Sequence, residues 1–186
     1  IEKIINSVMM QTHHFLEIII IDDASTDENE KKIQQYSDKR IIYVKNELNM
    51  GIAATLNRGL KLVSGEFIAR LDADDICHPQ RIKTQLQYFK QHPEIDILGS
   101  AFYTINPSSR IVREMRPHCF SYKLSPMILS RKCIFAHSSV MFRRKVIDDS
   151  NYYNENYSVV EDYEFWLRLV KKYNLVNLEE KLIYYR

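Results

Sequence analysis

Three carboxylates stand within four residues, at Asp72, Asp74 and Asp75, directly after the apolar run 67–71. This run predicts a buried strand that ends at the acids. Crowded carboxylates repel one another and are costly to desolvate unless they are paired. Asp72 and Asp74 would point to the same side of an extended strand end, where their oxygens could hold a hard cation. The motif therefore predicts a metal site, although surface aspartates before a proline-initiated helix would look the same.

A second acidic pair, Asp22 and Asp23, follows the run 15–21, which contains four consecutive isoleucines. A short β-branched run without polar alternation is typical of a strand covered on both faces, as in a parallel sheet. The carboxyl ends of such strands meet at one edge, where ligands bind. We therefore expect the two acidic clusters to share one cleft.

Strands and helices alternate over residues 1–94. Helices are expected at 2–11, 28–37, 52–63 and 79–92, and strands at 15–21, 40–45 and 67–72. Gly65 is expected to cap the third helix and Asp75 the fourth. The alternation predicts an α/β fold with a mostly parallel sheet and helices on both faces.

The rhythm changes after about residue 95. Strands are expected at 95–105 and 110–115, joined by the turn 106–109, followed by a helix at 121–130 and a buried strand at 134–142. A tyrosine-rich loop at 148–160, a helix from Glu161 and a short strand at 182–185 complete the chain. We expect one domain over 1–186, with a nucleotide-binding half at 1–94 and a smaller mixed half at 95–186.

The composition is that of a globular protein, with 45% hydrophobic and 27% charged residues. A net charge of +2 argues against nucleic acid binding. The basic cluster 143–145 is interpreted as a solvated face, the alternative being a contact to phosphate or anionic lipid. Three widely spaced cysteines indicate a reducing, cytoplasmic compartment. We find no signal peptide or membrane span, and the chain begins at Ile1, as a fragment would.

Asp162 lies three and four residues before Phe165 and Trp166, so on a helix it shares their face. A carboxylate placed in this way faces the interior or a cleft. Alternatively it complements the dipole of the first helical turn, as its neighbour Glu161 would do equally well. The spacing alone leaves both interpretations open.

Seven short segments, in this order and spacing, resemble the family-2 glycosyltransferases of GT-A fold, whose sheet is Rossmann-like. They are SVMMQT at 7–12, EIIIIDDASTD at 17–27, NMGIAATLN at 49–57, SGEFIARLDADD at 64–75, PQR at 79–81, HSSVMFR at 137–143 and EDYEFWLR at 161–168. Each segment is permissive, but together they cover almost the whole chain. The resemblance implies transfer of a sugar from a nucleotide diphosphate donor, here a UDP-sugar, to an acceptor hydroxyl.

The resemblance also implies roles for five residues. Asp23 would accept a hydrogen bond from the pyrimidine base, and Asp72 would lie near the ribose and diphosphate. Asp74 would bind Mn²⁺ or Mg²⁺, and His137 would lie near the diphosphate, unless it is a structural histidine. Asp162 would be the general base, on the face opposite the leaving group, which implies inversion at the anomeric carbon.

Further residues carry weaker expectations. Arg81 would reach a phosphate or pair with an acid, Arg168 would form a salt bridge, and Asn49 and Asn57 would shape the donor site. Tyrosines 152, 153 and 157 would stack on an acceptor sugar or anchor their loop. The expected acceptor is a saccharide or a lipid-linked saccharide of surface polysaccharide synthesis, so peripheral association with the inner membrane face is expected.

One departure from the family concerns the N-terminus. The family begins with a strand ahead of the helix that carries residues 7–12, and this sequence has none. A chain that starts at Ile1 should therefore bind its donor weakly and have reduced stability. The competing hypotheses are a sugar-nucleotide nucleotidyltransferase, which the segment around Asp162 argues against, and a catalytically silent module that binds nucleotide sugars.

Overall fold

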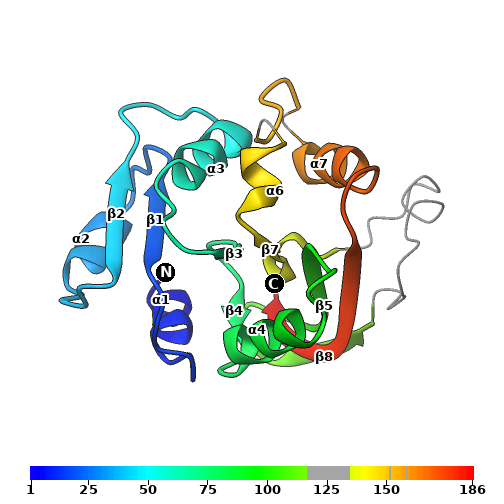
Figure 1. The fold of residues 1–186 in the computed structure, drawn as a ribbon. Coiled ribbons are helices and arrows are strands. Elements are labelled where there is room, and N and C mark those ends of the chain that lie inside the picture. The colour runs from blue at the N-terminus through cyan, green and yellow to red at the C-terminus, as the bar shows by residue number, and fades with distance from the viewer. Residues whose placement is uncertain (117–134, 151, 158) are drawn as a thin grey trace.

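The computed structural model describes residues 1–116, 135–150, 152–157 and 159–186. The expected helix at 121–130 lies outside these residues. In chain order the elements are α1 (Glu2–Met9), β1 (Ile18–Asp22), α2 (Asn29–Gln34), β2 (Ile41–Lys45), α3 (Ile52–Leu60), β3 (Phe67–Ala69), β4 (Ile76–Cys77), α4 (Arg81–Gln91), β5 (Ile97–Ile105), β6 (Ile111–Met115), the 3-10 turn η1 (His137–Ser139), β7 (Met141–Arg143), α6 (Lys145–Asp148), α7 (Glu161–Leu169) and β8 (Leu175–Tyr185) (Figure 1).

The strands form two sheets within the described residues. β1 pairs with β2 in parallel, and a six-stranded sheet has the order β3-β7-β5-β8-β4, with β6 paired to β5. The α/β class is confirmed, but the expectation of mostly parallel pairing is wrong in detail. Only β1–β2 and β5–β8 are parallel, whereas β3–β7, β4–β8, β5–β6 and β5–β7 are antiparallel. Of these antiparallel pairs, β5–β6 is joined by a short turn that reverses the chain, whereas the other three bring together strands far apart in the sequence, which local patterns do not predict.

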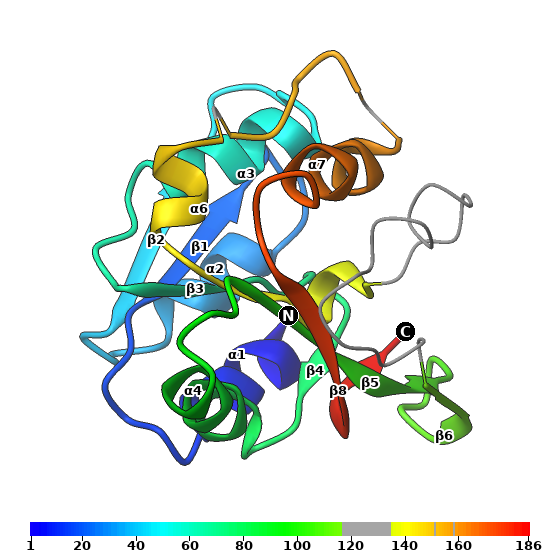
Figure 2. The ribbon, with the colours of Figure 1, turned by 45° about the vertical axis from the view of Figure 1, so that its right-hand side comes forward.

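Helices cover both faces of the large sheet, as predicted. α3, α6 and α7 lie on one side of it and α1 and α4 on the other (Figures 1 and 2). Neighbouring strand residues point to opposite faces, so Ile97 and Phe142 join the core under α7, while Leu98 and Met141 join the core over α4. The large sheet is therefore packed between two apolar cores, one on each face.

The edges of β1 and β3 that face each other are not hydrogen-bonded to one another in the described chain. Two cavities, of about 250 and 320 Å³, occupy this region. Both are lined by Glu17, Phe67, Ala69 and Leu71, and Ile19 and Ile21 of β1 line the first. The first half of the molecule therefore has an apolar gap next to two strand edges.

Several element boundaries differ from the sequence predictions. The described part of the apolar run 134–142 is not one strand, because residues 137–139 form η1 and the strand β7 begins only at Met141. α3 ends at Leu60 with Lys61 as its C-cap, so Gly65 does not cap it. Instead the Gly65 N–H donates to the Glu17 carboxylate at 3.1 Å. β8 begins at Leu175 rather than at residue 182, because it pairs in parallel along β5.

Candidate functional site

Asp23, which follows β1, is held by three donors from the segment after β2. Its Oδ1 accepts from Asn46 Nδ2 at 2.6 Å and from the Met50 N–H at 2.8 Å, and its Oδ2 accepts from the Gly51 N–H at 2.9 Å. Partial burial raises the pKa of this carboxyl, but the hydrogen bonds outweigh burial and lower it below the ordinary value. Asp23 is therefore a fixed anion whose Oδ2 can accept one more hydrogen bond.

The backbone beside Asp23 is conformationally unusual. Ala24 has φ of 60°, in the left-handed region that non-glycine residues avoid. Asp22, one residue earlier, is buried and accepts hydrogen bonds from the Ser25 N–H at 2.8 Å and from the Tyr43 hydroxyl at 2.7 Å. These contacts turn the chain sharply at the end of β1, which aims Asp23 at the segment after β2.

Asp72 lies past the end of β3 in an ion pair with Arg70. Its Oδ2 also accepts a hydrogen bond from Ser138 Oγ at 2.8 Å, and its N–H donates to the same hydroxyl at 3.0 Å. The prediction that residues 72–74 continue an extended strand is wrong, because the Asp75 N–H bonds back to the Asp72 carbonyl at 3.3 Å and forms a turn. Asp72 and Asp74, which form the DxD motif Asp72-Ala73-Asp74, therefore have carboxylates in different surroundings.

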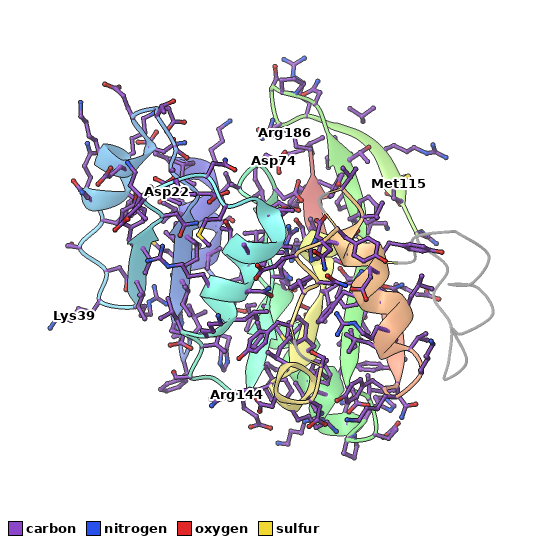
Figure 3. All side chains as sticks on the ribbon, turned by 90° about the horizontal axis from the view of Figure 1, so that it is seen from above. Asp22, Lys39, Asp74, Met115, Arg144 and Arg186 are labelled. Atoms are coloured by element: carbon purple, nitrogen blue, oxygen red, sulfur yellow. The ribbon has the colours of Figure 1, made fainter. Side chains whose placement is uncertain are left out.

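Asp74 is exposed, whereas Asp75 has an exposed fraction of only 1%. Asp75 does not cap α4 as expected. Its Oδ1 accepts from the Arg186 N–H at 2.8 Å, and burial raises its pKa to about 6. The Arg186 side chain donates to the Asp74 carbonyl at 3.0 Å and to the carbonyls of residues 106 and 107, so the acidic turn is tied to the β5–β6 hairpin (Figure 3).

The donor set of the acidic turn fits a cation that is shared with a ligand. Among the described residues, no group of three or more His, Cys, Asp or Glu side chains is arranged to hold a metal ion. Asp74 offers an exposed carboxylate, and Mg²⁺ and similar hard cations are commonly held by one or two carboxylates together with substrate phosphates. Asp74 is thus suited to contribute to such a site rather than to form it alone.

The η1 turn contacts both halves of the molecule. His137 Nε2 lies 2.9 Å from the Tyr153 hydroxyl, and its ring meets the edge of Trp166 with centroids 5.9 Å apart. Ser138 bonds to Asp72, and Ser139 Oγ accepts from the Ser100 N–H of β5 at 3.2 Å. Burial, with Arg70 contributing next, holds the pKa of His137 well below its usual value, so this histidine is neutral.

Asp162 lies in the first turn of α7, partly exposed, and its Oδ1 accepts from the Tyr163 N–H at 2.6 Å. Phe165 and Trp166, on the predicted shared face, are buried. Burial raises the pKa of Tyr153; Arg70 opposes this rise, and the charges of Asp162 and Asp72 add to it. The acidic strand end and the first turn of α7 therefore both lie within electrostatic reach of one tyrosine.

Three other predicted residues have structural contacts. Arg81, almost fully buried, pairs with no acid among the described residues and donates to the carbonyls of Arg70 at 2.8 Å and Val140 at 3.1 Å. Arg168 pairs with Glu164 at 2.9 Å, as expected. Asn57 binds both the N–H and the carbonyl of Tyr153, each at 2.9 Å.

The remaining predicted residues differ in exposure. Asn49 makes a long contact of 3.5 Å to the Asp23 carbonyl. Tyr153 is buried and anchors its loop, whereas Tyr157 is exposed. In the basic cluster 143–145, each side chain contacts a protein oxygen, namely the Ile95 carbonyl, the Ser64 carbonyl and the Asp96 carboxylate respectively.

Sequence reasoning missed three residues that hold the candidate acids. They are Arg70, Ser138 and Asn46, all of which are buried. Arg70 stands two residues before Asp72, a spacing that places two strand side chains on one face and could have indicated the ion pair. Ser138 and Asn46 gave no local signal, because their partners lie 66 and 23 residues away.

The profile described as Glycosyl transferase family 2 matches residues 1–150. This chain belongs to glycosyltransferase family 2. It is 33% identical over 190 residues to an uncharacterised glycosyltransferase of Methanocaldococcus jannaschii, covering 100% of this chain and 65% of the relative. It is also 30% identical over 171 residues to the UDP-Glc:alpha-D-GlcNAc-diphosphoundecaprenol beta-1,3-glucosyltransferase WfgD of Escherichia coli, covering 92% and 64% respectively. The family-2 chain thus spans just under two thirds of these relatives.

Solved structures share the fold of this family-2 chain. Staphylococcus aureus TarS 1–349 in complex with UDP superposes with a TM-score of 0.81 at 23% identity, covering 100% of this chain and 56% of the TarS 1–349 chain. The mannosyltransferase PcManGT of Pyrobaculum calidifontis, in complex with GDP-Man and Mn²⁺, gives 0.73 at 16%, covering 97% and 51%. The GT-A fold is confirmed. In the described part of the family-2 chain, every helix is too short or too polar to cross a membrane.

Proposed function

We propose that this chain is the donor-binding and catalytic region of an inverting, metal-dependent glycosyltransferase that uses a UDP-sugar. The observation that carries the proposal is that the η1 turn links the two acids: Ser138 bonds to Asp72, and His137 packs on Trp166 of α7, the helix whose first turn carries Asp162. Family membership favours this function over a nucleotidyltransferase. A silent binding module would not require a partly exposed carboxylate at the first turn of α7.

The proposed reaction assigns one task to each side chain. Asp23, held anionic, accepts a hydrogen bond from the base, and Asp72 orients the ribose and diphosphate. Asp74 would hold Mn²⁺ or Mg²⁺, which when bound stabilises the negative charge of the leaving diphosphate. His137, neutral and buried beside Ser138, supports the diphosphate side of the site.

Asp162 removes the proton from the acceptor hydroxyl while that oxygen attacks the anomeric carbon. Attack from the face opposite the diphosphate inverts this carbon in one displacement. Its only hydrogen bond given by the described residues comes from the adjacent Tyr163 N–H, which leaves Oδ2 available for the proton. The two halves, 1–94 and 95–186, would then serve donor and acceptor respectively.

The proposed acceptor is a saccharide or a lipid-linked saccharide. WfgD, by its name, acts on a diphosphoundecaprenol-linked sugar, and another relative, AmsE of Erwinia amylovora, 30% identical over 179 residues, is named for amylovoran biosynthesis. These names support a role in surface polysaccharide synthesis. An acceptor of this kind would place the enzyme at the cytoplasmic face of the inner membrane.

The experiment is release of free UDP from UDP-sugars, with Mn²⁺ or with EDTA. Asp162→Asn keeps the size of the side chain and removes the base, so we expect turnover to fall at least about 100-fold while donor affinity by calorimetry stays within about twofold. Glu164→Gln, two residues along α7, is the matched control. Full turnover of Asp162→Asn, or turnover in EDTA equal to that in Mn²⁺, would overturn the proposal.

A further inference from the structure

Arg70 is a buried cation beside the acidic turn. Its exposed fraction is 8%, and its Nη1 pairs with Oδ2 of Asp72, whose side chain is 30% exposed. The backbone of Arg70 is also fixed, because its N–H donates to the Val140 carbonyl at 3.0 Å and its carbonyl accepts from Arg81 Nη2 at 2.8 Å. The guanidinium therefore has a defined position and is not a mobile surface group.

Because of this ion pair, the two carboxylates of the DxD motif differ in their availability to a cation. Oδ2 of Asp72 already receives the guanidinium and the Ser138 hydroxyl, so a cation on this oxygen would have to displace a buried positive charge, and a cation on the other oxygen, Oδ1, would be repelled by that charge at short range. Asp74 is exposed and has its backbone carbonyl fixed by Arg186. Without a ligand, the turn therefore offers a divalent cation one unpaired carboxylate, which is too few oxygen ligands for tight binding.

We propose that Arg70 withholds Asp72 from metal, so that Asp74 binds a divalent cation only together with a nucleoside diphosphate. The inference rests on the proposed function and makes Arg70 a positioning residue that acts through Asp72. The diphosphate supplies the oxygens that the turn lacks, and Asp72 stays oriented by Arg70 and Ser138. Cation and donor then arrive as one unit, and the free protein holds little metal.

The first test uses the unaltered chain. Free Mn²⁺ is followed by electron paramagnetic resonance during titration of the protein, alone and with saturating UDP, with GDP in a parallel series. We expect the nucleoside diphosphate to tighten Mn²⁺ binding by at least about tenfold, within the usual range of coupling between two ligands. Equal Mn²⁺ affinity with and without nucleotide would refute the proposal, whether or not any donor is turned over.

The second test asks whether Arg70 is responsible. Arg70→Gln frees Asp72, so Mn²⁺ affinity without nucleotide should rise about tenfold, and adding Asp72→Asn to this variant should cancel the gain. Asp72→Asn alone should leave nucleotide-free affinity unchanged. Arg144→Gln, which removes a charge at the opposite end of the molecule, is the control (Figure 3).

Arg70→Lys keeps the charge and loses the forked guanidinium, and should give an intermediate Mn²⁺ affinity without nucleotide. An Arg70→Gln protein that is folded by circular dichroism and binds Mn²⁺ like the unaltered chain would overturn the assignment. These titrations need no turnover, so a failed transferase assay and a failed Arg70 role give different results.

Discussion

Ser138 donates a hydrogen bond to Oδ2 of Asp72 over 2.8 Å and accepts one from the Asp72 N–H over 3.0 Å. One hydroxyl thus fixes both the side chain and the backbone of an acid 66 residues away in the sequence. The acidic turn is therefore positioned by the second half of the chain, and the proposed donor site depends on a residue from that half.

Replacement of Ser138 should weaken the donor site without unfolding it. Ser138→Ala removes a hydrogen bond to a charged group that is partly solvated, so we expect donor affinity to fall about five- to tenfold in calorimetry, equivalent to about 1 kcal/mol. Ser139→Ala is the matched control, because this neighbour bonds to Ser100 and the Ala136 carbonyl instead. An equal loss in both variants would assign the effect to the turn as a whole.

The sequence predicted most elements of the first half, because each strand and helix there has its own periodicity. It also placed both acidic clusters at strand ends and the helix at Glu161. It failed at residues 134–142, where an apolar run resembles a strand. The run is broken at η1 because His137, Ser138 and Ser139 bond to distant partners, which no local pattern reveals.

The candidate acids could be recognised in the sequence by residue type, but the residues that hold them in place could not. Asp23 was visible as an acid after a strand, whereas Asn46 was one polar residue in a loop. Asp75 was expected to be a helix cap and is a buried acid bonded to Arg186 instead. Support of this kind depends on contacts between segments far apart in sequence, and it can be recognised only in the folded structure.

The buried histidine should make stability depend on pH. Burial, and next the charge of Arg70, keep the pKa of His137 well below 6.5, so the unfolded chain binds a proton below about pH 6.5 that the native chain does not. Stability contributed by neutral His137 is therefore lost as the pH falls. Relative to His137→Gln, the free energy of unfolding should drop as the pH falls from about 7.5 to 5.5, by on the order of 1 kcal/mol.

The measurement is urea unfolding of the unaltered chain and of His137→Gln across this pH range. The difference between the two free energies of unfolding removes the contribution of every other titrating group. Glutamine can still bond to the Tyr153 hydroxyl, so the comparison isolates protonation. His14→Gln, at an exposed position, is the matched control. Parallel stability curves for the unaltered chain and His137→Gln would show that position 137 does not carry the pH dependence.

Loss of the Asn57 side chain should destabilise the fold more than loss of the exposed Asn49 side chain. Asn57→Ala leaves the buried N–H and carbonyl of Tyr153 without their partner, so we expect a loss of about 2–3 kcal/mol in urea unfolding. Asn49→Ala, at an exposed site with one long contact, should cost less than about 0.5 kcal/mol. Similar losses for the two variants would contradict this role for Asn57.

The gap between β1 and β3 should accept an added strand. We expect an apolar β-branched segment fused with a short linker ahead of Ile1 to raise Tm by several degrees and to tighten donor binding, because it would fill the two cavities and pair with both edges. A fused polar Gly/Ser segment of equal length is the control. Donor affinity and Tm unchanged by the apolar fusion would contradict the expectation that this gap accepts a strand.

The η1 turn also constrains how the chain can vary in length. A 3-10 helix advances about 120° per residue, so three consecutive side chains point in three directions. Here these directions lead to the aromatic core, to the acidic turn and to β5. One inserted or deleted residue would rotate every side chain to a neighbour's partner, placing a hydroxyl in the core and an imidazole on the acid. This segment can therefore exchange side chains but cannot change its length, and insertions in homologous sequences belong in the outer loops.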